Sequence, residues 1–186
     1  LKNLDYPVAA PSANISSRLS SVKPSDVKEE FGPKIKYILN GGKSKIGVES
    51  TILNLLKKPS LLRYGGLDTK KIENVLNKKL LINTNLKKKL SPGLFPLHYS
   101  PGIPLRINVK KPKKDEAYLL IKKRKSNLKN YYYLSKVKNI EEAAKNLYST
   151  LRKIKNDGFK QIAVEYIPDK GLGKTINDRL KRASKY

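Results

Sequence analysis

The 186-residue sequence contains no cysteine, no methionine, no tryptophan and a single histidine. Without cysteine the chain can form no disulfide, no thiolate zinc site and no cysteine nucleophile, and one histidine cannot build a His-rich metal centre. We therefore assign no metal ligands. Acidic residues are also scarce, with 15 against 41 lysines and arginines. Any catalysis by this chain must use hydroxyl, amide, carboxylate and cationic groups.

Long apolar segments and export signals are also missing. No run of about 18 apolar residues appears, and the opening "LKNLDYPVAAPSAN" lacks the basic and apolar regions of a signal peptide. The sequence therefore predicts a soluble, cytoplasmic protein that does not bind membranes. Because Leu1 opens the chain in the middle of what reads as a domain, we expect the N-terminal part of a longer protein to precede it.

The formal net charge of +26 raises the question of nucleic-acid binding. Clustered lysines and arginines bind phosphates with release of counterions. Here the lysines are scattered through most segments, and the abundance of Lys, Asn and Ile is typical of drift toward A/T-rich codons. We therefore favour a compositional origin of the charge and keep a non-catalytic basic RNA-binding module as the alternative.

Residues 1–78 are predicted to form a compact mixed α/β unit. Its helices are indicated by start and stop signals, and its strands by apolar runs that flank turns. The Asn40-Gly41 pair is a strong cue for a hairpin that joins residues 34–40 to residues 43–56. The other expected elements are a helix after Pro24 with Ser25 as its cap and its end at Gly32, a strand at 60–66, and a helix at 67–77 with Asp68 or Thr69 as its cap and Ile72, Val75 and Leu76 on one face.

Residues 79–112 are predicted to form a proline-rich linker. Its centre, "SPGLFPLHYSPGIPL" at 91–105, is uncharged and holds four prolines. Prolines restrict the backbone, so this segment should be extended and should lose little entropy when it docks.

Residues 113–186 are predicted to form a second small α/β domain. Its expected elements are strands at 117–122, 131–135 and 161–167 and helices at 139–158 and 174–186. Strands that alternate with helices indicate a parallel or mixed sheet.

The "GLGKT" sequence at 171–175 resembles a phosphate-binding loop, but its spacing does not fit. Such a loop needs a glycine five residues before the Gly of the Gly-Lys pair. That position is Pro168, which has no N–H to offer to a phosphate. We therefore interpret the segment as a tight turn between a strand and a helix.

Ser50 and Arg63 are candidate ligand-binding residues. In "IGVESTILNL", Ser50 shares the strand alternation of Ile46 and Val48, so its hydroxyl should face the buried side, where an unpaired hydroxyl costs about 1–3 kcal/mol. Its partner could be the backbone or a ligand. Arg63 ends an apolar strand, where a guanidinium can hold a phosphate or carboxylate through two bonds or form a surface ion pair.

His98 and Tyr99 lie in the linker between Pro96 and Pro101. A lone histidine is more often structural than catalytic. An aromatic pair on a stiff apolar segment can nevertheless stack on a nucleotide or form a hydrogen bond with it.

Five segments occur in the order and spacing of a known family. They are "PVAAPSANISSRLS", "GGKSKIGVESTILNL", "LLRYGG", "PGLFPLHYSPGIPLR" and "LYSTLRKIKNDGFKQIAVEYIPDKGLGKTINDRLKRAS". Together they resemble the threonylcarbamoyl-AMP synthase family in its long form. The resemblance implies an α/β fold: the C-terminal part of a YrdC-like twisted catalytic domain, an extended linker, and a small Rossmann-like C-terminal domain. It also implies that the first half of the catalytic domain precedes Leu1.

The resemblance implies an enzyme that joins L-threonine, bicarbonate and ATP, with Mg²⁺, into threonylcarbamoyl-adenylate and releases pyrophosphate. The adenylate would serve the N6-threonylcarbamoyl modification of adenosine 37 in tRNA, together with tRNA-modification transferase proteins. Direct binding of tRNA is possible but not required.

The resemblance also assigns site residues. Ser12 and Ser50 match threonine-binding positions. Asn14, Arg63 and Tyr99, together with His98, match ATP-binding positions, and the linker is expected to close over the site as a lid. No general base is identified.

Several positions depart from the family pattern, among them residues 95–97, which lack the basic residues that many relatives place before the histidine. The Thr of a common Ser-Pro-Thr is Val22 here, so that nucleotide contact is expected to be lost or supplied by Ser20 or Ser21. The common Arg-Pro-Gly reads Arg-Tyr-Gly, with Tyr64 in the middle.

Overall fold

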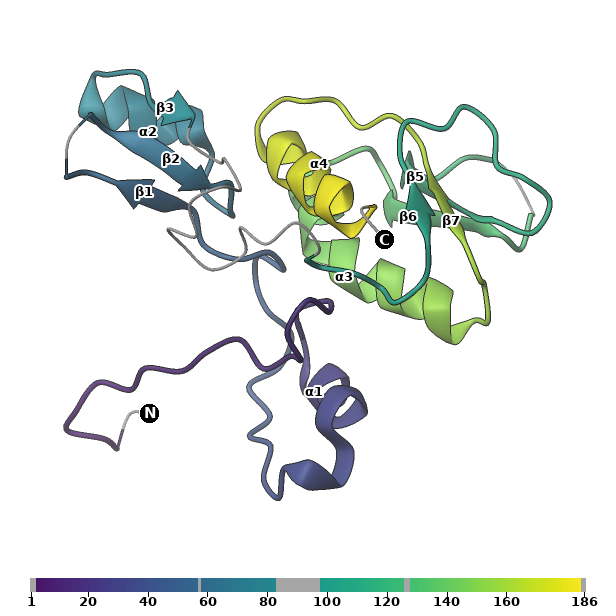
Figure 1. The fold of residues 1–186 in the computed structure, drawn as a ribbon, viewed down its shortest axis with the longest axis horizontal. Helices are drawn as coiled ribbons and strands as arrows, with labels where there is room; N and C mark the ends of the chain where they lie inside the picture. The colour runs from purple at the N-terminus through teal and green to yellow at the C-terminus, as the bar shows by residue number, and fades with distance from the viewer. Residues whose placement is uncertain (1–2, 57, 83–97, 126–127, 185–186) are drawn as a thin grey trace.

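The structure is a computed structural model that describes residues 3–56, 58–82, 98–125 and 128–184. The fold is mixed α/β, as predicted, and its two sheets lie apart (Figure 1). In chain order the elements are α1 (Pro24–Phe31), η1 (Gly32–Lys34), β1 (Ile52–Asn54), β2 (Ser60–Arg63), α2 (Thr69–Leu76), β3 (Leu81–Ile82), β4 (Leu105–Arg106), β5 (Ala117–Lys122), β6 (Tyr131–Ser135), α3 (Ile140–Asn156), β7 (Ile162–Val164) and α4 (Leu172–Ala183).

The C-terminal sheet is parallel throughout, in the strand order β4-β7-β5-β6. Side chains of β5 alternate between its two faces, as a strand requires. Leu119 and Ile121 join the large core cluster, whereas Tyr118 and Leu120 pack on the opposite side. Because both faces are covered, β5 reads as a continuous apolar run, which is typical of a central parallel strand.

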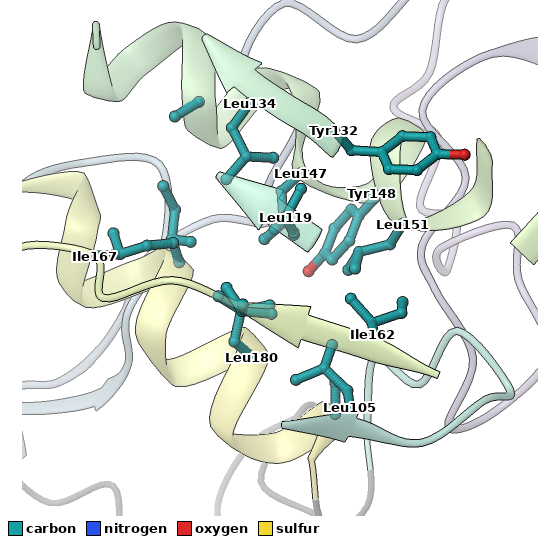
Figure 2. Packing of buried hydrophobic residues seen from close by; sticks show 14 of the residues in the cluster. Leu105, Leu119, Tyr132, Leu134, Leu147, Tyr148, Leu151, Ile162, Ile167 and Leu180 are labelled. Carbon is teal, nitrogen blue, oxygen red and sulfur yellow. The ribbon is translucent and has the colours of Figure 1, made fainter. Parts of the chain in front are cut away.

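Helices α3 and α4 cover one face of this sheet. The side chain of Asn139 caps α3 by accepting a hydrogen bond of 2.7 Å from the Glu142 N–H. The helix then buries an apolar stripe that includes Leu147 and Leu151 against the sheet, and Leu180 of α4 completes the core (Figure 2). Residues 105–184 thus supply most of the main hydrophobic core of the described chain, which Leu19, Val22 and Tyr99 complete.

The other face of the sheet is covered by loops and neighbouring strand residues rather than by helices in the described part of the chain. Val109, Tyr131 and Tyr133 pack there against Tyr118 and Leu120. The connection between β5 and β6 contains no helix in its described residues. The domain is thus a reduced Rossmann-like unit.

The N-terminal region contains a three-stranded sheet, in which β1 pairs antiparallel and β3 pairs parallel with the central strand β2. The hairpin predicted at Asn40-Gly41 is wrong, because residues 35–51 contain no strand. The hairpin instead joins β1 to β2. The turn cue is local, whereas residues 43–51 are held by contacts with distant segments that no local cue reveals.

The two N-terminal helices follow their predicted positions with two corrections. Lys23, not Ser25, is the N-cap of α1, and Pro24 occupies the first turn, where its missing N–H is harmless. Helix α2 is capped by Asp68, which accepts a bond of 3.0 Å from the Lys70 N–H. Val75 does not lie on the packed face and is 87% exposed.

The predicted linker contributes a strand to the C-terminal sheet. Strand β4 lies within residues 79–112 and pairs with β7. Of the proline-rich centre, residues 98–105 are described, whereas 91–97 lie outside the described residues. None of the described helices is long and apolar enough to cross a membrane.

Arg152 and Gly47 are among the residues that join the N-terminal region to α3. The largely buried Arg152 donates to the Leu19 carbonyl at 3.2 Å and pairs with Glu30 at 3.4 Å. Gly47 has a φ of +80°, and a Cβ there would lie 2.5 Å from the Lys145 carbonyl oxygen of α3. The backbone can approach the helix this closely only because position 47 is glycine.

Candidate active site

The centre of the candidate site is a buried ion pair between Glu49 and Arg179. Nε of Arg179 lies 2.9 Å from Oε2 of Glu49, and the arginine side chain is only 1% exposed. The hydroxyl of Tyr148 lies within 3.0 Å of both carboxylate oxygens, and Ser20 donates to Oε1 at 2.6 Å. A buried charge pair is tolerated only when such additional hydrogen bonds satisfy it.

Tyr99 of the linker packs on this ion pair. Its ring lies 4.5 Å from the Arg179 guanidinium carbon and stacks on Tyr148 at 5.9 Å, and the His98 ring meets its edge at 4.0 Å. Tyr99 is 1% exposed and has a φ of +60°, a conformation that is strained for a large residue. Its buried hydroxyl has no hydrogen-bond partner in the described chain.

Ser50 and Arg63 contact each other beside this cluster. Nη2 of Arg63 lies 3.2 Å from the Ser50 hydroxyl, and Nε donates to the Ser50 carbonyl at 3.1 Å. Ser50 is not part of a strand and is exposed, so the expectation that its hydroxyl faces the buried side is wrong. Gly65, two residues after Arg63, also allows a close approach, because a Cβ there would lie 2.1 Å from the Thr51 nitrogen.

The "GLGKT" turn serves as a contact between the two regions. Helix α4 begins at Leu172, and the buried hydroxyl of Thr175 donates to the Gly65 carbonyl at 2.8 Å. Arg179, one turn later, donates to the Tyr64 carbonyl at 2.7 Å. The hydroxyl that a phosphate-binding loop would use is therefore engaged in holding the Arg63-Tyr64-Gly65 segment.

Asn14 lies in a turn that reaches the linker from the other side. Its side-chain amide donates to the carbonyls of Ile15 at 3.0 Å and Arg18 at 3.3 Å, and its buried Oδ1 has no partner in the described chain. The same turn pairs with the linker, because Ser100 donates to the Ser17 carbonyl at 2.9 Å. Asn14 therefore belongs to a turn that contacts Ser100, the residue after Tyr99.

Ser12 is the least defined of the predicted site residues. It is exposed, and its hydroxyl makes no hydrogen bond to the described residues.

The departure from the family pattern at position 22 has a structural reason, because Val22 is buried in the main core cluster. Ser20 bonds to Glu49 and Ser21 to the Ala13 carbonyl at 2.6 Å, so both hydroxyls are engaged within the protein.

Burial and charge shift the titration of the clustered groups. Burial lowers the pKa of His98 below its ordinary value of 6.5, against the opposing charge of Glu49, and the charges of Arg179, Arg182 and Arg63 lower it further. Burial alone would raise the pKa of Glu49, but Arg179 and the Ser20 hydroxyl outweigh it and hold that pKa below 4.5. His98 is therefore neutral and Glu49 ionised at pH 7.

A cavity of about 490 Å³ adjoins the linker on the side of α1. It is lined by residues 16–19 and 100–102, by Glu29 and Glu30, and by basic residues of α3. Glu30 pairs there with Arg18 at 3.7 Å and with Arg152 at 3.4 Å. The opposite charges in this cavity therefore partly offset one another.

Metal ligands are not gathered anywhere in the described residues. No group of three or more His, Asp or Glu side chains is placed there to hold a metal ion. The described site instead offers hydroxyl groups, a guanidinium and the aromatic pair of the linker, among them Ser50, Arg63 and Tyr99.

Glu49, Tyr148 and Arg179 are the residues that sequence reasoning missed. One signal was available: Arg179 lies between Ile176 and Leu180 on the apolar stripe of its helix, where a charged residue needs a buried partner. Glu49 likewise stands inside an apolar run. No local pattern indicated that these two charges pair across 130 residues.

The chain resembles known proteins over nearly its whole length. Residues 67–185 match the family model for threonylcarbamoyl-AMP synthase, C-terminal domain, and residues 1–65 match the model described as telomere recombination. The chain is 34% identical over 203 residues to the threonylcarbamoyl-AMP synthase of Pyrococcus abyssi and 32% identical over 204 residues to that of Bacillus subtilis. These alignments cover 98% and 99% of this chain but 59% of each relative.

Two solved structures of Pyrococcus abyssi Sua5 share the fold. The complex with L-threonine superposes with a TM-score of 0.80 at 32% identity and covers 95% of this chain and 57% of that one. A variant with a histidine and a tyrosine replaced by alanine gives 0.76 at 31%, covering 95% and 56%. These similarities confirm the predicted fold class. The chain belongs to the threonylcarbamoyl-AMP synthase family.

Proposed function

We propose that this chain takes part in the synthesis of threonylcarbamoyl-adenylate. The threonine amine takes up the carbon of bicarbonate, with loss of water, and the resulting carbamate oxygen attacks the α-phosphorus of ATP. The bond to the β-phosphate breaks, pyrophosphate leaves, and a mixed anhydride of carbamate and AMP remains. This reaction needs placement of two anions and stabilisation of developing charge more than it needs a covalent nucleophile.

One observation carries the proposal: the segments around Ser50, Arg63 and Tyr99 meet around the Glu49–Arg179 ion pair. The resemblance assigns Ser50 to threonine and the other two residues to ATP. A relative of similar fold, Pyrococcus abyssi Sua5, has been crystallised with L-threonine. By this likeness, we assign threonine binding in this chain to Ser12 and Ser50.

We assign the remaining predicted residues to the nucleotide. The guanidinium of Arg63 would offset the negative charge of the phosphates, and Asn14 would offer a side-chain carbonyl that lacks a partner in the described protein. His98 and Tyr99 would cover the bound nucleotide and exclude water from the easily hydrolysed anhydride. Mg²⁺ enters this proposal as part of the MgATP substrate.

The product would be used in the cytoplasm by a transferase that modifies adenosine 37 of tRNA. Because this adenylate hydrolyses easily, rapid transfer from this protein to the transferase would limit its loss. Direct contact of this chain with tRNA is not needed for the proposed step.

The test is pyrophosphate release by the complete natural protein. We expect release to require L-threonine and bicarbonate together, and labelled bicarbonate to appear in an adenylate product. Equal release without threonine would refute the proposal.

Matched variants locate the activity. Ser50→Ala should raise the KM for threonine, whereas Ser149→Ala, which removes a hydroxyl bonded only within α3, should not. Arg63→Ala should weaken ATP binding, and Lys174→Ala should leave turnover unchanged, because the turn at 171–175 binds no phosphate.

A basic RNA-binding module without catalysis is the second candidate, favoured only by the net charge of +26. It predicts tRNA binding that weakens steeply with salt, together with no ATP binding. A nucleotide titration at two salt concentrations separates the two candidates.

A further inference from the structure

Helix α4 places one arginine against three separate parts of the candidate site. Arg179 pairs with Glu49, next to Ser50, and donates to the carbonyl of Tyr64, next to Arg63. Its guanidinium also lies against the ring of Tyr99. These three neighbours belong to different segments of the chain. Glu49 and Tyr64 directly adjoin residues that we assign to a substrate, and Tyr99 is itself assigned to ATP.

If the side chain at position 179 only filled the core, burial of an arginine would carry a desolvation cost that an apolar residue avoids. The neighbouring stripe residues Ile176 and Leu180 are apolar, and a buried ion pair is often no more stabilising than apolar residues of similar volume. An arginine differs from an apolar residue in offering several donors in a fixed planar arrangement. That arrangement can fix the relative positions of three loops, which an apolar side chain cannot.

We propose that Arg179 is a positioning residue, through which the C-terminal domain holds the lid residue Tyr99 and the loops of Ser50 and Arg63 in one fixed arrangement. The proposal rests on the proposed function, because it takes Tyr99 and Arg63 as residues that contact ATP. It assigns the C-terminal domain a direct part in forming the nucleotide site.

The strained backbone of Tyr99 supports this role. A φ of +60° persists only where the surroundings fix the residue, and Arg179 and Tyr148 are the side chains stacked on its ring. Loss of the guanidinium would remove the charged face of this contact. Tyr99 could then relax to an ordinary backbone conformation and leave the site.

His98 provides a reporter of this arrangement that does not depend on activity. It is the only histidine, so its ring protons give a single resolved set of NMR signals, and its ring lies 4.0 Å from that of Tyr99. In Arg179→Met we expect the His98 ring signals to move toward the values of a free histidine, because the ring current of Tyr99 no longer acts on them.

Arg182→Met is the matched control. Arg182 is also a buried arginine of α4 and shares its described partner, Asp178, with Arg179, but no described contact joins it to Glu49, Tyr64 or Tyr99. Both variants remove a positive charge that lowers the pKa of His98, so both should raise that pKa. Only Arg179→Met should also change the ring shifts at pH values where His98 is neutral. Identical ring shifts in wild type and Arg179→Met would overturn the proposal.

The kinetic readout separates positioning from loss of folded protein. A lower fraction of folded enzyme reduces apparent kcat and leaves KM unchanged. We expect Arg179→Met to raise the KM for ATP about tenfold or more and the KM for threonine less, because Ser50 still has Arg63 as a partner. Arg179→Lys, which keeps the charge near Tyr99, should recover part of the ATP KM. An unchanged KM with reduced kcat would contradict the proposal.

A second variant keeps the test informative if Arg179→Met does not fold. Glu49→Gln keeps hydrogen-bonding groups for Ser20 and Tyr148 but removes the charge that anchors Arg179. It should move the His98 ring signals in the same direction to a smaller extent, and unchanged signals would again contradict the proposal. If wild-type protein binds no ATP, the proposed function fails, whereas the His98 signals still decide whether Arg179 positions Tyr99.

Discussion

Residues 105–184 and residues 3–82 differ in how they bury apolar surface. The C-terminal region builds one core around β5 and α3, and its large exposed apolar side chains are few. The N-terminal region has two separate pieces, α1 and the three-stranded sheet, which lie apart in Figure 1. Most of the exposed large apolar residues lie here: Leu4, Tyr6, Val8, Ile15, Tyr37, Leu39, Ile46, Leu55, Leu56, Leu67, Val75, Leu81 and Ile82.

The same comparison draws attention to the contacts that join the two regions. Within this chain, polar contacts with α4 join the loops that carry Ser50 and Arg63 to the C-terminal region. These contacts are the basis of the proposal that the C-terminal domain supports the candidate site. Loops on a rigid scaffold are a common location for binding residues.

The largest expected effect is on the C-terminal core. Leu119→Ala removes a side chain with no exposure in the central strand and should lower the free energy of unfolding by about 2–5 kcal/mol. Leu56→Ala, in the N-terminal region, removes a side chain that is 93% exposed and should change it by less than about 0.5 kcal/mol. Chemical denaturation followed by circular dichroism measures both. Equal losses would show that the two regions do not differ in this way.

The contact between the regions should be next in size. Thr175→Val removes the buried hydroxyl that donates to the Gly65 carbonyl and leaves that carbonyl without its donor, which should cost about 1–3 kcal/mol. Thr150→Val, at a half-exposed position of α3, serves as the control and should cost less. Thermal unfolding of both variants compares them, and a harmless Thr175→Val would argue that the contact adds nothing to the interface.

Acidification should weaken the same interface in two stages. His98 has a folded pKa below 6.5, so its contribution to stability is complete above about pH 6.5 and is lost as the pH falls through the folded value. The contribution of Glu49 is complete above pH 4.5 and is lost as the pH falls through its own lowered pKa. Glu49→Gln should therefore reduce the loss of stability below pH 4.5. Unfolding midpoints measured from pH 7.5 to 3.5 test this, and an unchanged acid limb would contradict it.

The smallest expected change in stability comes from two tyrosines with buried hydroxyls that lack partners in the described chain, Tyr99 and Tyr133. Replacement of either by phenylalanine should leave stability nearly unchanged, because no hydrogen bond within the described protein is lost. Only Tyr99→Phe should weaken ATP binding, measured by calorimetric titration. Equal ATP affinity in both variants would remove the Tyr99 hydroxyl from the nucleotide site.

The sequence predicted the C-terminal elements well because their signals are local and strong. The apolar run of β5 and the 3.6-residue period of α3 each indicate one structure, and the core then confirms both. The same procedure failed at residues 34–51. The Asn40-Gly41 cue is a local preference, whereas this segment is fixed by the approach of Gly47 to α3 and by the ion pair of Glu49.

The candidate site was predicted in part for a similar reason. Short motifs pointed to Ser50, Arg63 and Tyr99, and the structure brings these three segments together around one ion pair. The residues that join them, Glu49 and Arg179, lie far apart in the chain and belong to no common motif. Such a long-range pair can be identified only in the folded structure. A charged residue on the apolar stripe of a helix nevertheless indicates that a buried partner must exist.

Amide hydrogen exchange gives the most direct test of the claim that the C-terminal domain holds the candidate site. The Gly66 N–H donates to the Glu49 carbonyl at 2.8 Å and reports on the loops of Ser50 and Arg63 together. In Arg179→Met this amide should exchange much faster than in wild type, while amides of β5 and α3 keep their protection and Arg182→Met leaves Gly66 unchanged. Unaltered exchange at Gly66, or an equal loss of protection throughout β5, would contradict the account.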